Sequence, residues 1–135
     1  MPAQSSGAGS SFGLSRIAQI AVTVHDVGRA VKFYRDQLGL PFLFEAPGLA
    51  FFQAGDIMLM LSLPSSPEFD HPGSVLYFEV DQIDQAHRSL VERGVPFQDS
   101  PHIVHRAPDY ELWMAFFQDP DRNTLAIREQ RNTAA

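Results

Sequence analysis

Apolar and polar residues alternate along two short segments of the chain, residues 20–24 and 76–80. Strict alternation over about five residues is typical of a β-strand with one buried face. After each segment, apolar residues recur at spacings of three and four, which is typical of a helix with one buried side. The hydrophobic pattern therefore predicts a strand followed by a helix, twice along the chain.

Both helical patterns carry residues that begin and end helices. Asp26 precedes the first helix and can accept a hydrogen bond from a first-turn amide, and Asp81 or Asp84 is expected to do the same for the second. Gly39 and Gly94 follow the last apolar positions, where a left-handed residue commonly ends a helix. A proline two residues later prevents each helix from restarting. Each helix is therefore expected to end at its glycine.

Further matches indicate that this pattern belongs to a duplicated unit. The sequence Ala-Phe-Phe-Gln occurs at residues 50–53 and again at 115–118, followed each time by a turn and an apolar stretch. Three strands are therefore expected after each helix, so that each unit reads β-α-β-β-β. The expected strands are residues 41–46, 49–53 and 57–63 in the first unit, and 97–106, 111–118 and 124–129 in the second.

A chain of 135 residues suits one domain with one hydrophobic core. We expect a flexible tail at residues 1–14, one domain at 15–130 and a short tail at 131–135. Within the domain, proline, serine and glycine are concentrated between the two units. The expected division is module one at 15–63, a linker at 64–73 and module two at 74–130.

Composition excludes several classes of function. The formal net charge is −6 and Lys and Arg are not clustered, which argues against a nucleic-acid partner. The chain has no cysteine, so disulfides, thiolate catalysis and iron–sulfur clusters are excluded. No apolar run approaches the roughly 18–20 residues of a membrane span, and the first residues do not form a signal peptide. We expect a cytoplasmic protein with neither nucleic acid nor membrane as a partner.

The chain resembles the vicinal oxygen chelate superfamily, which includes glyoxalase I, bleomycin-resistance proteins and extradiol dioxygenases. The resemblance lies in residues 20–26 and 33–40, and in Asp-Pro-Asp-Arg-Asn at 119–123, where Arg122 replaces the glycine usual in the family. It implies an α+β fold in which two tandem βαβββ modules form a curved, cup-like mixed sheet with helices on its outer face.

The resemblance also implies four positions for metal ligands on the inner face of the cup. By position they fall on Gln19, Met60, Val75 and Ala126, and three of these four lack an oxygen or nitrogen donor. One amide and a thioether do not hold a divalent ion, and shifting a strand by one residue moves its side chains to the other face. We therefore expect no metal at the inherited site and no cofactor.

The alternation separates core residues from residues that face the cavity. Residues 20, 22 and 24, with 76, 78 and 80, are expected beneath the helices. The residues that alternate with these core positions then point to the other face of the sheet. They form a mainly apolar pocket with a few polar groups, which is the usual composition of a small-molecule site. The candidate ligand-binding residues are Gln19, Thr23, Met58, Met60, Tyr77, Glu79, Trp113 and Arg128.

Histidines supply two alternatives. His102 and His105 lie three positions apart on an expected strand, so they share a face, and could share a metal, only if the strand has a bulge. His105 and Glu111 flank the connection between two strands. They could form a catalytic acid–base pair or a surface ion pair.

Three functions stay open at this point. The first is a metal-free protein that binds a small apolar or aromatic molecule, with Glu79 and Glu111 favouring a positively charged one. The second is a lyase, isomerase or dioxygenase that uses a relocated metal or the pair of His105 and Glu111. The third is a structural or partner-binding domain whose cup is filled by side chains. The resemblance further implies a homodimer, with the cup closed within one chain or between two.

Overall fold

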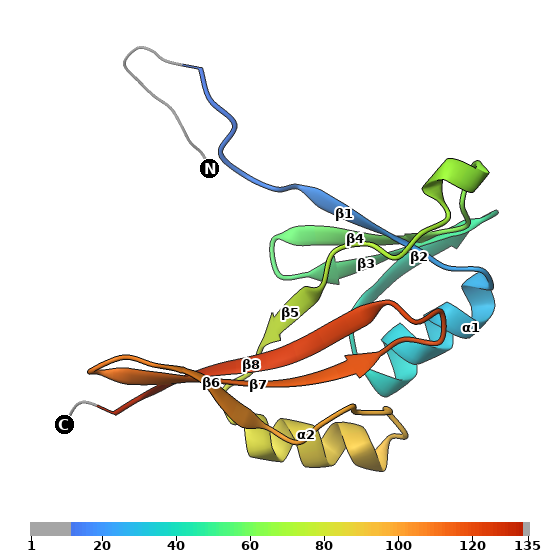
Figure 1. Cartoon of the computed structure of the whole chain (residues 1–135). Helices are drawn as coiled ribbons and strands as arrows, with labels where there is room; N and C mark the ends of the chain where they lie inside the picture. The colour runs from blue at the N-terminus through green and yellow to red at the C-terminus, as the bar shows by residue number, and fades with distance from the viewer. Residues whose placement is uncertain (1–11, 134–135) are drawn as a thin grey trace.

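The computed structural model describes residues 12–133 and contains two four-stranded sheets, each with a helix against one face (Figure 1). The first module begins with β1 (Gln19–Thr23) and α1 (Val27–Val31), which continues as a π-helical segment (Lys32–Gln37). The hairpin strands β2 (Phe42–Ala46), β3 (Leu49–Ala54) and β4 (Ile57–Ser62) follow. A short 3₁₀ turn, Pro67–Phe69, lies between the modules. No helix in the described range is long and apolar enough to cross a membrane.

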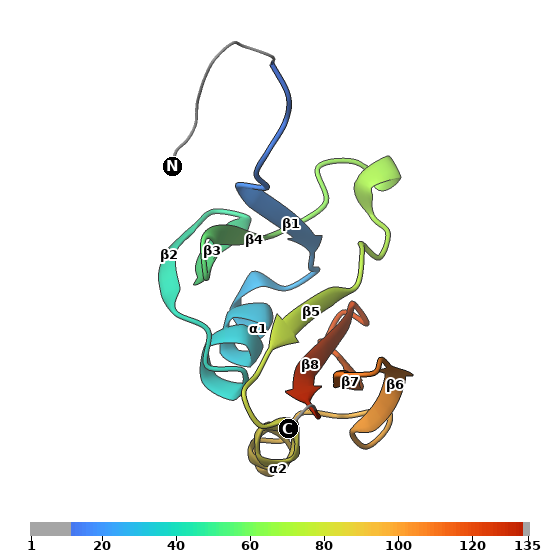
Figure 2. The same ribbon diagram turned by 90° about the vertical axis from the view of Figure 1, so that its left-hand side faces the viewer.

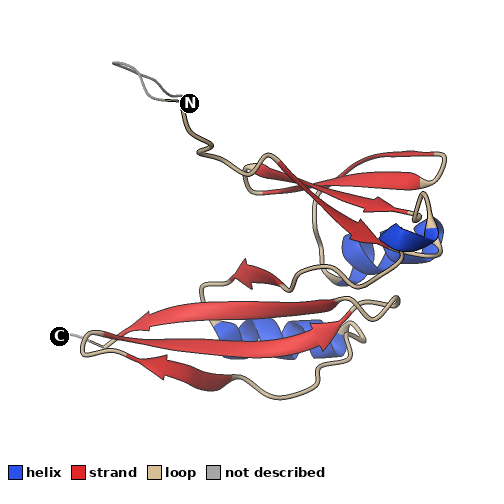
Figure 3. Cartoon of the chain, turned by 45° about the horizontal axis from the view of Figure 1, so that its top comes forward, coloured by secondary structure: helices blue, strands red, loops and turns tan. Residues whose placement is uncertain are grey.

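The second module repeats the first. It contains β5 (Leu76–Glu79), α2 (Ile83–Glu92), β6 (His102–Arg106), β7 (Tyr110–Gln118) and β8 (Thr124–Asn132). The strand orders are β1-β4-β3-β2 and β5-β8-β7-β6, with the first and last strands of each module parallel. Figure 3 shows the sheets as two separate groups of strands, each with its helix. The α+β fold of two βαβββ modules is confirmed.

The predicted helix ends are largely confirmed. The Asp26 side chain accepts a hydrogen bond from the backbone N–H of Arg29 at 3.0 Å. Gly39 and Gly94 have φ values of 77° and 86° in the left-handed region, which glycine adopts without steric cost. Local sequence therefore determines where α1 begins and where both helices end.

The start of α2 differs from the prediction. Its first flanking residue is Gln82, whose side chain makes no capping bond, so the expectation of a cap at Asp81 or Asp84 is wrong. Instead, the Glu129 carboxylate on β8 accepts a hydrogen bond from the backbone N–H of Ile83 at 3.0 Å. A carboxylate at a helix N-terminus satisfies a free amide and interacts favourably with the helix dipole. The helix is capped from the sheet.

Two strands of the second module, β6 and β8, differ from the expected bounds by more than one residue. β6 begins at His102 rather than at residue 97, and residues 97–101 contribute only an isolated bridge between Phe97 and Phe117. Pro101 immediately before β6 has no N–H for ladder pairing. β8 continues to Asn132, opposite Tyr110, so residues 131–132 belong to a strand and not to a tail. The expected N-terminal tail lies mostly outside the described residues.

One core joins the two modules. The rings of Phe33 and Phe117 lie 6.4 Å apart, and the Tyr34 hydroxyl donates a hydrogen bond to Asp119 at 2.8 Å. Figure 2 shows α1 and α2 on the same side of β8, β7 and β6. The modules therefore pack through their helix-bearing faces. The predicted core positions are confirmed, because all six are buried or packed against the core: Ile20, Val22, Val24, Leu76, Phe78 and Val80.

Packing through these faces leaves the other face of each sheet directed away from the core. These two surfaces are called here the helix-free faces. No strand pairing joins β1 to β5 within residues 12–133, so each is an edge strand of its own sheet. One chain therefore carries the two halves of the expected cup as separate sheets.

Candidate functional site

The helix-free face of the first sheet is mainly apolar. The register places Gln19 beside Met58 on β4, and Thr23 beside Ser62. The Gln19 amide lies 3.8 Å from the Met60 sulfur, in weak donor contact. Further out, the rings of Phe44 and Phe51 lie 4.7 Å apart. Three of the candidate residues (Gln19, Met58 and Met60) therefore share a surface of thioether and aromatic groups.

Thr23 has a different use at the edge of this surface. Its hydroxyl donates a hydrogen bond to the carbonyl of Phe69 at 3.1 Å. Phe69 belongs to the short turn between the modules, so Thr23 anchors that connection to β1. The side chain lies on the expected face, but its donor is occupied.

The helix-free face of the second sheet carries an aromatic pair and an ion pair. Tyr77 lies opposite Ala126, and its ring makes an edge-to-face contact with Phe116 at 6.0 Å. Tyr77 is 49% exposed, which leaves much of its ring open to solvent. Arg128 lies 3.4 Å from Glu79. The candidates Tyr77, Glu79 and Arg128 are therefore neighbours, and Arg128 offsets part of the negative charge of Glu79.

Trp113 does not lie on this face. It has the same parity on β7 as Ala115 and Phe117, which are buried in the core on the helix side. Its indole N–H donates to Glu111 at 3.1 Å, and the Arg131 guanidinium lies 4.5 Å from its ring centroid. The expectation that Trp113 faces the cavity is wrong, because β7 turns it, together with Glu111, toward the helix-bearing face.

The acid–base pair of His105 and Glu111 is not assembled. His105 lies opposite Leu112, whereas Glu111 lies opposite Arg106, with a nitrogen–oxygen distance of 3.7 Å. Neighbouring positions on a strand point to opposite faces, so the imidazole and the carboxylate are separated by the sheet. Glu111 forms ion and hydrogen-bond contacts with Arg106 and Trp113 instead.

A bulge in β6 does bring the two histidines to one face. The register shifts between Ile103 and His105, so that His102 lies opposite Met114 and His105 opposite Leu112. Met114 and Leu112 both project to the helix-free face, and the histidines follow them. Even so, residues 12–133 contain no group of three or more histidine, aspartate or glutamate side chains that could hold a metal ion. The relocated metal site therefore lacks ligands.

The four inherited metal positions do not fit a metal ion either. Gln19 supplies one neutral amide, and Met60 supplies a thioether in contact with it. Val75 and Ala126 have no donor atoms in their side chains, and Ala126 is completely buried. A divalent cation needs several carboxylate, carbonyl or imidazole ligands. No reaction step through a metal at these positions can be derived from this donor set.

A polar cluster at the junction of the modules was not predicted from the sequence. The imidazole of His25 lies 2.9 Å from Asp121 through Nδ1 and 2.7 Å from Asp70 through Nε2. Asp121 also accepts from Arg29 at 2.9 Å, and its side chain is 1% exposed. Hydrogen bonds that the imidazole makes to the carboxylates of Asp70 and then Asp121 raise the pKa of His25. The cluster ties β1, the connection and the β7–β8 turn together.

The β7–β8 turn is itself built around a buried carboxylate. Asp119 accepts hydrogen bonds from the backbone N–H groups of Asp121 and Asn123, from the Asn123 amide and from Tyr34, each at 2.8 Å. Asn123 also donates to the carbonyl of Thr23 on β1 at 2.9 Å. Through Tyr34 and Thr23, this turn binds module two to module one.

Comparisons with known proteins agree with this architecture. The model of the Glyoxalase/Bleomycin resistance protein/Dioxygenase superfamily matches residues 16–127. The uncharacterised protein YraH of Bacillus subtilis (strain 168) is 30% identical over 129 residues, covering 83% of this chain and 96% of YraH.

Solved structures show the same fold. A superfamily member from Sphaerobacter thermophilus matches with a TM-score of 0.71 and 25% identity, covering 86% of this chain and 98% of the other. A lactoylglutathione lyase from Agrobacterium tumefaciens matches with a TM-score of 0.66 and 26% identity, covering 86% and 94%.

Proposed function

Because the chain belongs to the glyoxalase/bleomycin resistance protein/dioxygenase superfamily, we propose that it binds a small apolar or aromatic molecule without a metal ion. One observation carries the proposal. The four positions where the family's metal ligands are expected hold Gln19, Met60, Val75 and Ala126, and the surface around them is lined by thioether and aromatic groups. Such a surface favours contact with an apolar ligand over coordination of a cation.

The binding cup is formed between two copies of the chain in this proposal. The helix-free faces of one chain point away from their shared core, so they do not enclose a ligand together. The edges of β1 and β5 carry backbone N–H and C=O groups that no strand within residues 12–133 pairs. Open edge strands are suited to pairing with another chain. In a homodimer, the first sheet of one copy lies beside the second sheet of its partner.

Charge gives the ligand one further property. Glu79 lies at the open edge of the second sheet with 58% of its side chain exposed, next to the half-exposed ring of Tyr77. A carboxylate beside an aromatic face favours a cationic group on the ligand. Arg128 at 3.4 Å weakens this preference without removing it. The preferred ligand is therefore an aromatic molecule that carries an amine.

The test is a binding screen with untagged protein. Aromatic amines and their neutral analogues are compared by thermal shift and isothermal titration calorimetry, and metal content is measured by mass spectrometry. We expect several ligands to raise Tm, weaker binding by Tyr77→Ala, and no stoichiometric divalent ion. Tyr110→Ala is the matched control, because Tyr110 lies at the far end of β7 from Phe116. Stoichiometric metal, or no ligand among the amines and neutral analogues, contradicts the proposal.

Assembly is measured on the same protein. Size-exclusion chromatography with light scattering is expected to give twice the chain mass of 15.0 kDa. Replacing Ala21 on the exposed edge strand β1 by proline removes one ladder donor and is expected to shift the protein toward the monomer. A wild-type monomer that still binds the amines would contradict the shared cup while leaving the ligand class intact.

A further inference from the structure

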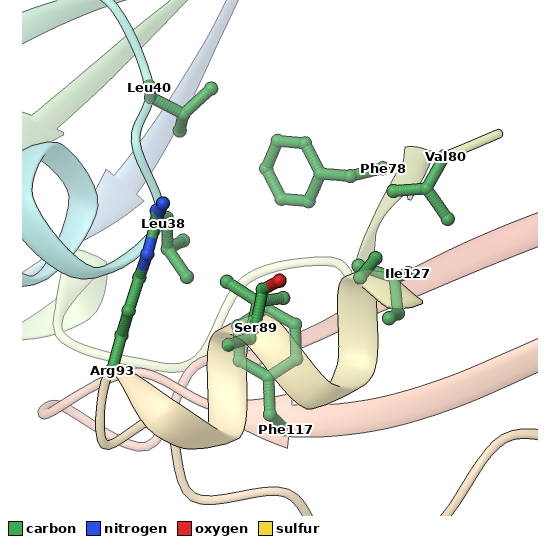
Figure 4. Close-up of a pocket in the computed structure, with 10 residues that line it drawn as sticks. Leu38, Leu40, Phe78, Val80, Ser89, Arg93, Phe117 and Ile127 are labelled. Carbon is green, nitrogen blue, oxygen red and sulfur yellow. The ribbon is translucent and has the colours of Figure 1, made fainter. Parts of the chain in front are cut away.

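A second cavity lies on the other side of the second sheet. It is a crevice between the end of the first helix and α2, with a volume of about 260 Å³ (Figure 4). Phe78, Phe117 and Ile127 belong to its wall, and their neighbours Tyr77, Phe116 and Ala126 face the helix-free side. Successive residues of a strand point to opposite faces. The sheet itself therefore separates this crevice from the proposed cup.

The walls of the crevice are apolar and come from both modules. Module one contributes Leu38 and Leu40, and module two contributes β5, α2, β7 and β8. A cavity of about 150 Å³ lined by similar side chains holds benzene, so a space of 260 Å³ accommodates roughly ten non-hydrogen atoms. The volume suits a single aromatic ring with a short side chain.

Two polar groups face this apolar space. Ser89 and Arg93 lie four positions apart at the end of α2, so they occupy the same side of that helix. Figure 4 shows Arg93 extending from the end of the helix toward Leu38. The remaining side chains of the wall are hydrocarbon, which makes Arg93 its one charged group among the described residues.

Arg93 has hydrogen-bonding capacity to spare. Its only side-chain hydrogen bond within residues 12–133 runs from Nη1 to the backbone carbonyl of Gln37, at a long 3.4 Å. No aspartate or glutamate of that range lies within ion-pair distance of its guanidinium. The planar guanidinium presents paired donors whose spacing matches the two oxygens of a carboxylate.

We propose that this crevice binds a small aryl carboxylate. The ring packs against Leu40, Phe78 and Leu90, and the carboxylate accepts hydrogen bonds from the Arg93 guanidinium and the Ser89 hydroxyl. The ligand touches both modules, so its binding also holds α2 against the end of the first helix. The site is independent of the proposed cup and needs no second copy of the chain.

The probe is 4-phenylbutanoate, titrated calorimetrically and followed by ligand-observed NMR. We expect saturable binding by the wild type, and no binding of 4-phenylbutan-1-ol at the same concentrations. Arg93→Gln is expected to raise Kd at least tenfold. Arg93→Lys is expected to give an intermediate Kd, because lysine keeps the positive charge but lacks the paired N–H donors of the guanidinium. Arg88→Gln is the matched control, since Arg88 lies on α2 outside the crevice and should change Kd less than twofold.

Several results would overturn the proposal. Absence of saturable binding by the wild type would mean that the crevice does not bind an aryl carboxylate. Equal binding of the alcohol, or an unchanged Kd in Arg93→Gln with an unchanged Tm, would remove Arg93 from the site. Binding lost in Tyr77→Ala but kept in Arg93→Gln would assign the carboxylate to the cup. Failure of the amine screen leaves these outcomes unaffected.

Discussion

Removing the hydroxyl of Tyr34 tests the hydrogen bond that links the two modules most directly. Tyr34 is completely buried, and its hydroxyl donates to the Asp119 carboxylate at 2.8 Å. Tyr34→Phe keeps the ring in the core and deletes only this bond. A hydrogen bond to a charged group contributes about 1.5–3 kcal/mol, and Asp119 keeps three other donors, so its charge is not left unpaired. We expect a loss of about 2 kcal/mol in the free energy of unfolding.

The loss is large enough to measure by two methods. An unfolding entropy of about 2.1 cal/mol/K per residue gives about 0.28 kcal/mol/K for 135 residues, so Tm should fall by about 7 °C. Urea unfolding followed by circular dichroism gives the free energy, and calorimetry gives Tm. Tyr110→Phe is the control, since the Tyr110 hydroxyl makes no side-chain hydrogen bond with residues 12–133, and it should stay within about 0.5 kcal/mol.

The same pair of proteins gives a pH dependence with a definite sign. Burial and then the neighbouring Asp119 charge raise the pKa of Tyr34 well above its ordinary value. Because the pKa of Tyr34 is higher in the folded state, the stabilisation that its neutral hydroxyl gives is fully present below about pH 10, the pKa of the unfolded side chain. This stabilisation is lost as the pH rises above that value. The difference between wild type and Tyr34→Phe should therefore shrink as the pH rises beyond 10. A variant within 0.5 kcal/mol of wild type at pH 7 would refute the reasoning.

Three smaller predictions concern the ends of elements. His25→Gln should destabilise the protein more at pH 5.5 than at pH 8.5. The pKa of His25 is raised in the folded state, so the stabilisation from its protonated ring is present below about pH 6.5 and is lost as the pH rises through the folded-state pKa. His71→Gln is its control, and equal losses at both pH values in urea unfolding would contradict the carboxylate bridges. Arg122→Gly should raise the free energy of unfolding by about 0.5–1 kcal/mol, since Arg122 has a φ of 69°, and a lower Tm would contradict this. Glu129→Ala should cost about 1 kcal/mol through loss of the α2 cap and speed amide exchange at Ile83, and unchanged exchange would exclude the cap.

Much of the fold follows from local patterns in the sequence. Alternation placed Val22, Val24 and their counterparts in the core, and the glycines at the helix ends adopt the left-handed conformation expected of them. These features depend on residues close together in the chain, where the period of a strand or helix acts directly. Because the order of elements is duplicated, the pattern of one module predicted that of the other and so covered the whole domain.

The face of Trp113 was not predictable in this way. β7 carries large apolar residues on both faces, with Met114 and Phe116 on one side and Trp113 and Phe117 on the other. Alternation therefore carries no polar signal that distinguishes the core from solvent. The position of the bulge in β6 was not predictable either, because no glycine or other typical bulge residue marks it in the sequence.

Contacts between distant residues were also beyond the sequence. His25 and Asp121 are 96 positions apart, and Glu129 caps a helix that begins 46 positions earlier. Such pairs have no fixed spacing that a pattern can detect. They form because the modules bring the β7–β8 turn to β1 and the last strand to the start of α2.

The amino-acid sequence by itself determined two βαβββ modules, their buried faces and the loss of donor side chains at Met60, Val75 and Ala126, because each depends on residue type or short-range period. Only the tertiary structure decided how the modules pack. Burial of Phe33 and Tyr34 against Phe117 joins the helix-bearing faces, which turns the halves of the cup outward and leaves a crevice beside Arg93. That choice results from the summed free energy of burying side chains from both modules in one core, which no single segment of the chain contains.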